Sequence, residues 1–248
     1  MKASVASVLA VAVVAAGVAW PGAARAVSFL DDIFPGGEWT ATKTFDSTTA
    51  QNGAFAADQA APDGNPGTFR QTRLAVTGPG GLVVSHLRNG AVYDPAVDGP
   101  IGTISFSLDV RFLGGSQGTS QTLYELDLLQ SGAHYLSNAT AALAQGPGDG
   151  AAGSWTAFSF SGLTASDFNR FAGSGPSNPD FSALGAPIQF GFLNTVSEAF
   201  GNPLFVTSGI DNWSVQLHPT PEPATILLLG SSLAGLGAAA AWRKRGRR

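Results

Sequence analysis

The chain has 248 residues, no cysteine, 13 Lys or Arg and 17 Asp or Glu, and a formal net charge of -4. The absence of cysteine excludes disulfides, thiolate catalysis and thiolate metal sites. Residues 27–220 hold 6 basic and 16 acidic side chains, a net charge of -10, which disfavours nucleic acid as a partner because an acidic surface repels phosphate.

The first 26 residues have the form of a secretory signal peptide. An apolar run over 3–19 follows Lys2, and Ala24-Arg25-Ala26 is an A-x-A site of the kind that signal peptidase cuts. A run of this length also suits an uncleaved membrane helix, but the A-x-A site favours cleavage. We expect signal peptidase to cut after Ala26, so that residues 1–26 are lost.

Residues 27–217 are expected to form one all-β domain. The clearest strand covers 104–112, where every second residue is apolar. Further strands are expected at 38–45, 68–76, 82–88, 122–129, 188–192 and 213–217 and around Phe158 and Phe160. Clusters rich in Gly and Pro separate these runs, which favours a sandwich of two sheets. Only 164–171 has helical spacing, with Phe168 and Phe171 placed to bury one face.

Four segments give the domain a familiar appearance: Gly64-Asn65-Pro66-Gly67, 91–96, 179–182 and 209–213. Their order resembles the jelly-roll, concanavalin-like sandwich of exported bacterial proteins. The resemblance implies a jelly-roll fold. It leaves the activity open, because the same fold is found in lectins, glycosidases and inert surface modules.

Two carboxylates form the sharpest catalytic candidate. Glu125 and Asp127 are two residues apart on an expected strand and therefore share a face, as the carboxylates of a glycosidase must. The segment resembles the E-x-D-x-E strand of jelly-roll glucanases, although the third acidic position is Leu129. A solvent-facing acidic strand is the preferred interpretation, and a polysaccharide-acting glycosidase is the alternative.

Other patterns with catalytic or metal-binding potential are weaker. Gly114-x-Ser116-x-Gly118 matches a nucleophile elbow, but strands are expected on both sides where the elbow needs a helix. His86, His134 and His218 have no second histidine at metal-ligand spacing. Calcium is a further alternative, with oxygen ligands from Asp63, Asn65, Asp94 and Asp98, although Asx turns explain the same residues. We expect no catalytic residue, no metal and no cofactor.

Aromatic side chains are the candidates for glycan contact. Trp39, Tyr93 and Trp155 lie beside polar residues, and aromatic rings flanked by hydrogen-bonding groups are suited to sugars. The competing interpretation is that a tryptophan in a strand belongs to the core.

The C-terminal 28 residues combine three parts. Pro221-Glu222-Pro223 closes a linker over 218–223, an apolar segment spans 224–242, and Arg243, Lys244, Arg245, Arg247 and Arg248 form a basic end at 243–248. Nineteen helical residues measure about 28 Å, enough to cross a hydrocarbon core, and the basic end is expected to stop in the cytoplasm.

This order of parts resembles the PEP-CTERM sorting signal of bacterial envelope proteins. The resemblance implies processing near Pro221 to Pro223 by an exosortase-type membrane protease, whereas a permanent anchor is the alternative. The chain is thus expected to be an exported, non-enzymatic protein of the cell surface or extracellular matrix. Its expected path leads through the inner membrane, with the body in the periplasm, and exopolysaccharide is the candidate ligand.

Overall fold

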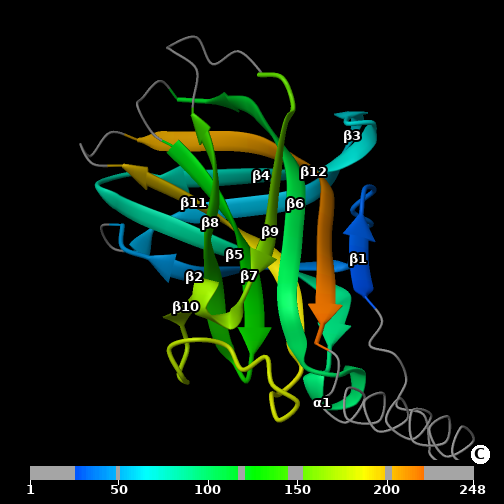
Figure 1. Cartoon of the computed structure of the whole chain (residues 1–248). Helices are drawn as coiled ribbons and strands as arrows, with labels where there is room; N and C mark the ends of the chain where they lie inside the picture. The colour runs from blue at the N-terminus through cyan, green and yellow to red at the C-terminus, as the bar shows by residue number, and fades with distance from the viewer. Residues whose placement is uncertain (1–25, 49–50, 117–120, 145–152, 199–202, 221–248) are drawn as a thin grey trace, which may run out of the picture.

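Antiparallel strands make up most of the residues described by the computed structural model, 26–48, 51–116, 121–144, 153–198 and 203–220 (Figure 1). They are β1 (Val27–Asp31), β2 (Trp39–Asp46), β3 (Ala54–Gly64), β4 (Gly67–Val76), β5 (Gly80–Tyr93), β6 (Ile101–Gly115), β7 (Gln121–Gln130), β8 (Ala133–Ala144), β9 (Thr156–Leu163), β10 (Phe168–Ala172), β11 (Ile188–Glu198) and β12 (Leu204–Pro219). A short helix, α1 (Pro95–Asp98), and a 3-10 turn over Ala165–Asp167 complete the described elements.

The strands form two six-stranded sheets. One has the order β3-β4-β12-β6-β9, with β1 beside the second half of β12. The other has the order β10-β8-β7-β11-β5-β2. The expected all-β sandwich of two sheets is therefore confirmed.

Period-two alternation builds the core between the sheets. In β6 the side chains of Ile104, Phe106, Leu108, Val110 and Phe112 are at most 7% exposed, as their spacing predicted. Trp213 of β12 is fully buried, and its ring meets that of Trp39 edge to face at a centroid distance of 5.1 Å.

A layer of polar side chains crosses the core and divides it into two apolar clusters. Asn194 of β11 donates to Thr72 of β4 at 3.0 Å, and the Thr72 and Ser208 hydroxyls lie 2.9 Å apart. Arg70 donates to Nδ1 of His86 at 3.3 Å. Because Arg only donates, His86 must carry its proton on Nε2 and donate to Asn194, 3.0 Å away. The layer thus joins the two sheets at one level.

The segment 164–171 differs from its expected helix. Thr164 precedes a single 3-10 turn, and Phe168 and Phe171 both fall in strand β10. Phe168 is fully buried, whereas Phe171 is 38% exposed, because residues three apart in a strand face opposite sides. This difference leaves the Phe171 ring on the outside of the sandwich.

Candidate functional site

The outer face of the β10-β8-β7-β11-β5-β2 sheet is concave. Phe45 of β2 and Phe171 of β10 belong to opposite edge strands, yet their ring centroids are 6.0 Å apart. The edges of a flat six-stranded sheet would be about 24 Å apart, so this sheet must curl until its edges meet. Figure 1 shows β2 and β10 side by side. We call this surface the concave face and the two rings the aromatic bridge.

The floor of the concave face is closed to solvent. Asp127, Ser85 and Leu193 lie on this face at 0%, 1% and 1% exposure, although an outer face is ordinarily open to water. Ser85 donates to the Asp127 carboxylate, and Nδ1 of His134 lies 3.1 Å from the same group. Burial lowers the pKa of His134, but the hydrogen bond and charge of Asp127 outweigh it and leave this pKa raised.

A pocket of about 300 Å³ opens beside the aromatic bridge, between β7, β8 and β10. A bulge in β8 lies at this pocket. In the pairing of β7 with β8, Glu125 pairs with Thr140 and Asp127 with Leu136. Three residues of β8, 137–139, therefore stand opposite the single residue Leu126 of β7. The Leu126 backbone amide donates to the Ser137 hydroxyl at 3.3 Å, and Asn138 is exposed. The pocket is lined by Glu125, Leu136, Ser137, Asn138, Thr140, Asn169, Arg170 and Phe171.

Acidic, basic and neutral polar side chains lie beside an aromatic ring in this pocket. Thr140 donates to the Glu125 carboxylate at 2.9 Å, and Asn169 donates to Asn138 at 2.8 Å. Burial raises the pKa of Glu125 more than the Thr140 hydrogen bond lowers it. With the exposed Arg170 and the Phe171 ring, the pocket offers donors, acceptors and an apolar surface within one small volume.

The aromatic residues proposed from the sequence lie elsewhere. Trp39 is 7% exposed and donates its indole N–H to Asp31 at 2.8 Å, and Tyr93 is 1% exposed with its hydroxyl 2.8 Å from the Gly99 carbonyl oxygen. Both are core residues in this structure and present no ring face to a ligand. Trp155 is half-buried, packs against Phe69 and donates to the Asp63 carbonyl at 3.2 Å. None of the three lines the pocket.

Glu125 and Asp127 share the concave face, as expected from their spacing. Their surroundings differ, since Glu125 lines the pocket and Asp127 is fully buried against Ser85 and His134. Only the first carboxylate is therefore open to a bound molecule.

The remaining histidines and the Ser116 motif have local partners. Burial and the charge of Arg70 lower the pKa of His86 to about 3, so its imidazole is neutral. His218 lies on the surface, 3.2 Å from the Ser105 hydroxyl. Ser116 bonds to the backbone of Phe205 through both its amide and its hydroxyl, and Gly118 lies outside the described residues.

The loops considered for calcium are held by hydrogen bonds. Asp94 caps α1, Asp98 accepts from the Asp94 backbone amide at 3.2 Å, and the Asn65 side-chain amide donates to Asp109 at 2.9 Å. Within the described ranges, no group of three or more His, Asp or Glu side chains is placed to hold a metal ion.

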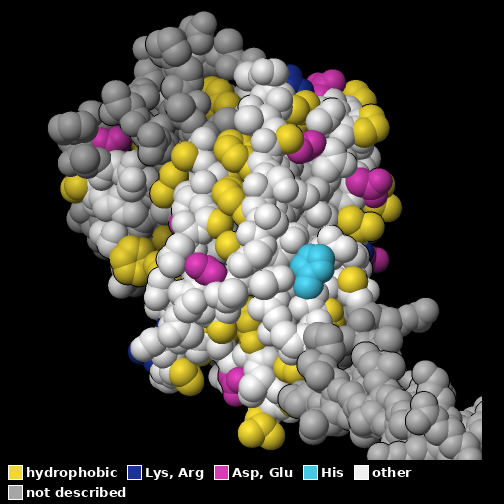
Figure 2. All heavy atoms as spheres, in the orientation of Figure 1, with side chains coloured by type: hydrophobic (Ala, Val, Ile, Leu, Met, Phe, Trp, Pro, Cys, Tyr) yellow, Lys and Arg dark blue, Asp and Glu magenta, His cyan; other side chains and the backbone are white. Residues whose placement is uncertain are grey.

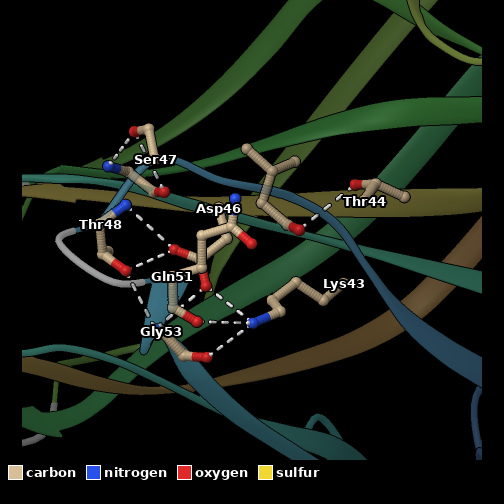
Figure 3. Close-up of polar contacts among 9 residues, drawn as sticks. Lys43, Thr44, Asp46, Ser47, Thr48, Gln51 and Gly53 are labelled. Atoms are coloured by element: carbon tan, nitrogen blue, oxygen red, sulfur yellow. Dashed lines mark hydrogen bonds and ion pairs between the residues drawn. The ribbon is translucent and has the colours of Figure 1, made fainter.

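The loop after β2 gathers several oxygens around an ammonium group (Figure 3). Lys43 donates to Asp46 at 2.7 Å and to the carbonyl oxygens of Gln51 and Gly53 at 3.3 and 3.2 Å. Burial raises the pKa of Asp46, but hydrogen bonds from Lys43 and Thr48 outweigh it and lower this pKa to about 2. The Lys43 ammonium is thus the positive group that these oxygens surround.

The predicted export signals lie outside the described residues. This holds for Ala24, for Pro221-Glu222-Pro223, for the apolar segment and for the basic end. In the described part of the chain, no helix is long and apolar enough to cross a membrane. The last described residue, Thr220, donates its amide to the Pro100 carbonyl at 2.9 Å, beside α1.

The pocket residues of β8 and β10 escaped the sequence analysis. Asn138, Thr140 and Asn169 are ordinary polar residues, and no spacing marks them as a group. The spacing of Phe168 and Phe171 predicts a helix, whereas both residues lie in strand β10. The segment Asn169-Arg170-Phe171 does carry a signal, because an aromatic residue follows polar ones there, as Trp39 follows Glu38 and Trp155 follows Ser154.

Comparison with known proteins finds likeness only among solved structures. No family model matches the sequence, and no curated protein matches it. The family 11 carbohydrate-binding module of a cellulosomal cellulase of Clostridium thermocellum is 10% identical, with a TM-score of 0.43 over 79% of this chain and 98% of that one. The C-terminal family 22 carbohydrate-binding module of Clostridium thermocellum Xyn10B is 15% identical, with a TM-score of 0.34 over 75% and 91%.

An enzyme is also among these structures. An exo-β-agarase is 12% identical, with a TM-score of 0.37 over 77% of this chain and 25% of that one. With identities of 10–15% and TM-scores of 0.34–0.43, these similarities do not assign the ligands or activities of those proteins to this chain.

Proposed function

We propose that the chain is an exported protein of the cell surface or extracellular matrix whose sandwich binds a glycan without turnover, in the pocket between β7, β8 and β10. The observation that carries the binding proposal is the pocket itself. There the Glu125 carboxylate and the amides of Asn138 and Asn169 converge beside the exposed ring of Phe171.

The chemistry of this pocket suits a sugar. A sugar ring presents hydroxyls around its edge and C–H groups on its faces. Amides and carboxylates donate to or accept from hydroxyls, while an aromatic ring packs against the C–H face. Few polar groups with fixed positions beside apolar surface are the usual composition of a small-molecule site.

The state of the two carboxylates favours binding over hydrolysis. A glycosidase needs two carboxyl groups on either side of the scissile bond. Glu125 reaches the pocket, but the Asp127 carboxylate is fully buried and already bonded to Ser85 and His134. A polysaccharide-acting enzyme that uses this pair would have to expose Asp127 first.

The route to the cell surface is proposed from the sequence. Signal peptidase removes residues 1–26, the segment 224–242 holds the chain in the inner membrane, and an exosortase-type protease cuts near Pro221 to Pro223. The body would then reach an exterior rich in exopolysaccharide. Its acidic surface suits that place, since Figure 2 shows Asp and Glu spread over one face with few Lys or Arg.

A glycan array tests the binding proposal. We expect the full chain to bind at least one glycan, and Asn169→Ala to weaken that binding by about tenfold because the change removes a side-chain amide of the pocket lining, which donates to Asn138. Gln216→Ala is the matched control, since Gln216 is an exposed amide on β12 of the other sheet. An equal loss of glycan binding in both variants would contradict binding in this pocket. Glycan hydrolysis that Glu125→Gln abolishes would instead indicate an enzyme.

The sorting proposal has its own test. Mass spectrometry of the exported protein should find an N-terminus at Val27 and a C-terminus close to Pro221–Pro223. A C-terminus still at Arg248 would instead identify a permanent anchor.

A further inference from the structure

The concave face is interrupted beside the pocket. Phe171 lines the pocket, and its ring contacts Phe45 from the opposite edge of the sheet. Beyond this aromatic bridge the floor is closed, with Asp127, Ser85 and Leu193 at 1% exposure or less. A polymer lying in the pocket therefore finds no open groove that continues across the sheet.

The size of the pocket points the same way. Its volume of about 300 Å³ is at the lower end of the range for ligand sites, which leaves room for about one or two sugar rings. A site for the interior of a polysaccharide needs open space on both sides of the bound rings. Here the aromatic bridge, formed by Phe171 and Phe45, closes one side of the pocket.

The charge of the surroundings selects among sugars. Glu125 lies in the pocket wall, and residues 27–220 carry a net charge of -10. Both repel a carboxylate or sulfate on the ligand. Arg170 at the pocket is exposed and screened by water, so it offsets this repulsion only in part.

We propose that the pocket takes the terminal residue of a neutral glycan chain and not a stretch of its interior. This inference rests on the proposed glycan binding and adds the part of the polymer that is recognised. A surface protein of this kind would hold a matrix by its chain ends.

Calorimetry with a length series tests the inference. The full chain, in a detergent without a sugar head group, is titrated with cello-, laminari- and xylo-oligosaccharides from dimer to hexamer and with the parent polymers. For a series that binds, we expect the dissociation constant to change by less than about twofold with length. One protein should bind per polymer chain end, and borohydride reduction shows whether the reducing end is the one bound.

The aromatic bridge provides the decisive variant. Phe45→Ala removes one ring of the bridge without touching the pocket lining, so longer oligosaccharides should gain affinity by about threefold or more while the dimer is unchanged. Phe205→Ala, an exposed phenylalanine on β12 of the other sheet, should change neither.

The contrary outcomes are distinct. Affinity that rises with every added sugar in the unaltered chain, with several proteins on each polymer, would overturn chain-end recognition but leave glycan binding intact. No heat from any series, together with no binding on the glycan array, would overturn the proposed function itself.

Discussion

At the scale of single residues, the same chemical type plays opposite roles according to what surrounds it. His86 is fully buried, accepts from Arg70 and is neutral, whereas His134 is bonded to Asp127 and has a raised pKa. Two carboxylates on one strand differ in the same way, since Glu125 is open to the pocket and Asp127 is not. Residue type alone therefore does not identify the functional group.

The pKa of His86 predicts how stability depends on pH. Its pKa is about 3 when folded and 6.5 as an ordinary value, so the unfolded chain takes up a proton on acidification that the folded chain refuses. The free energy of unfolding should fall by up to about 1.4 kcal/mol per pH unit between about pH 6 and pH 5. His134 does not mask this fall in stability. Folding raises its pKa, so the stabilisation that its protonated form contributes is already fully present below about pH 6.5.

Urea denaturation at a series of pH values measures this slope. His86→Gln keeps an acceptor for Arg70 and a donor for Asn194 but cannot be protonated, so the slope should largely disappear. An unchanged slope in this variant would assign the pH dependence to other groups.

At the scale of elements, strand pairing holds each sheet together, and a layer of buried polar side chains aligns the two sheets with each other. The polar layer links β4 and β12 of one sheet to β5 and β11 of the other through Asn194 and Thr72. Burial of apolar side chains is favourable in any direction, whereas buried hydrogen bonds need matched donors and acceptors and so accept few alternative alignments.

Asn194→Ala tests this role. The change removes the acceptor of the His86 Nε2 proton and one hydrogen bond of the Thr72 hydroxyl in the core, and we expect a loss of about 2–3 kcal/mol in the free energy of unfolding. Asn169→Ala, on the surface of β10, should cost less than about 0.5 kcal/mol although it weakens glycan binding. Thermal and urea unfolding of both variants measures the difference, and equal stabilities would show that the layer is dispensable.

The strands that sequence reasoning found and missed differ in composition. The alternation over 104–112 predicted β6 because each inward position carries a large apolar side chain. β8 (Ala133–Ala144) and β3 (Ala54–Gly64) were missed, since both are rich in Ala, which is depleted in strands and makes no strong pattern. β8 carries the bulge beside the pocket, so without this strand the sequence indicated Glu125 but not the residues that surround it.

At the scale of the whole molecule, the curl of one sheet decides which residues are exposed. Trp39 and Phe45 are six residues apart in one strand, yet Trp39 lies in the core and Phe45 bridges to Phe171 on the far edge, because the pairing of β2 with β5 shifts between Lys43 and Phe45. Local sequence predicts which residues alternate, but not which face closes on itself. For this reason the fold class was predictable and the aromatic residues of the candidate site were not.

The most direct test of the central claim is a glycan titration followed by NMR on the side-chain amides of the full chain. We predict that the amide resonances of Asn138 and Asn169 shift together on addition of a glycan that the array identifies. Those of Asn212, which is bonded to Asp109 at 2.8 Å on the other sheet, should stay in place. Shifts at Asn212 with none at Asn138 and Asn169 would place the ligand elsewhere and contradict the proposed site.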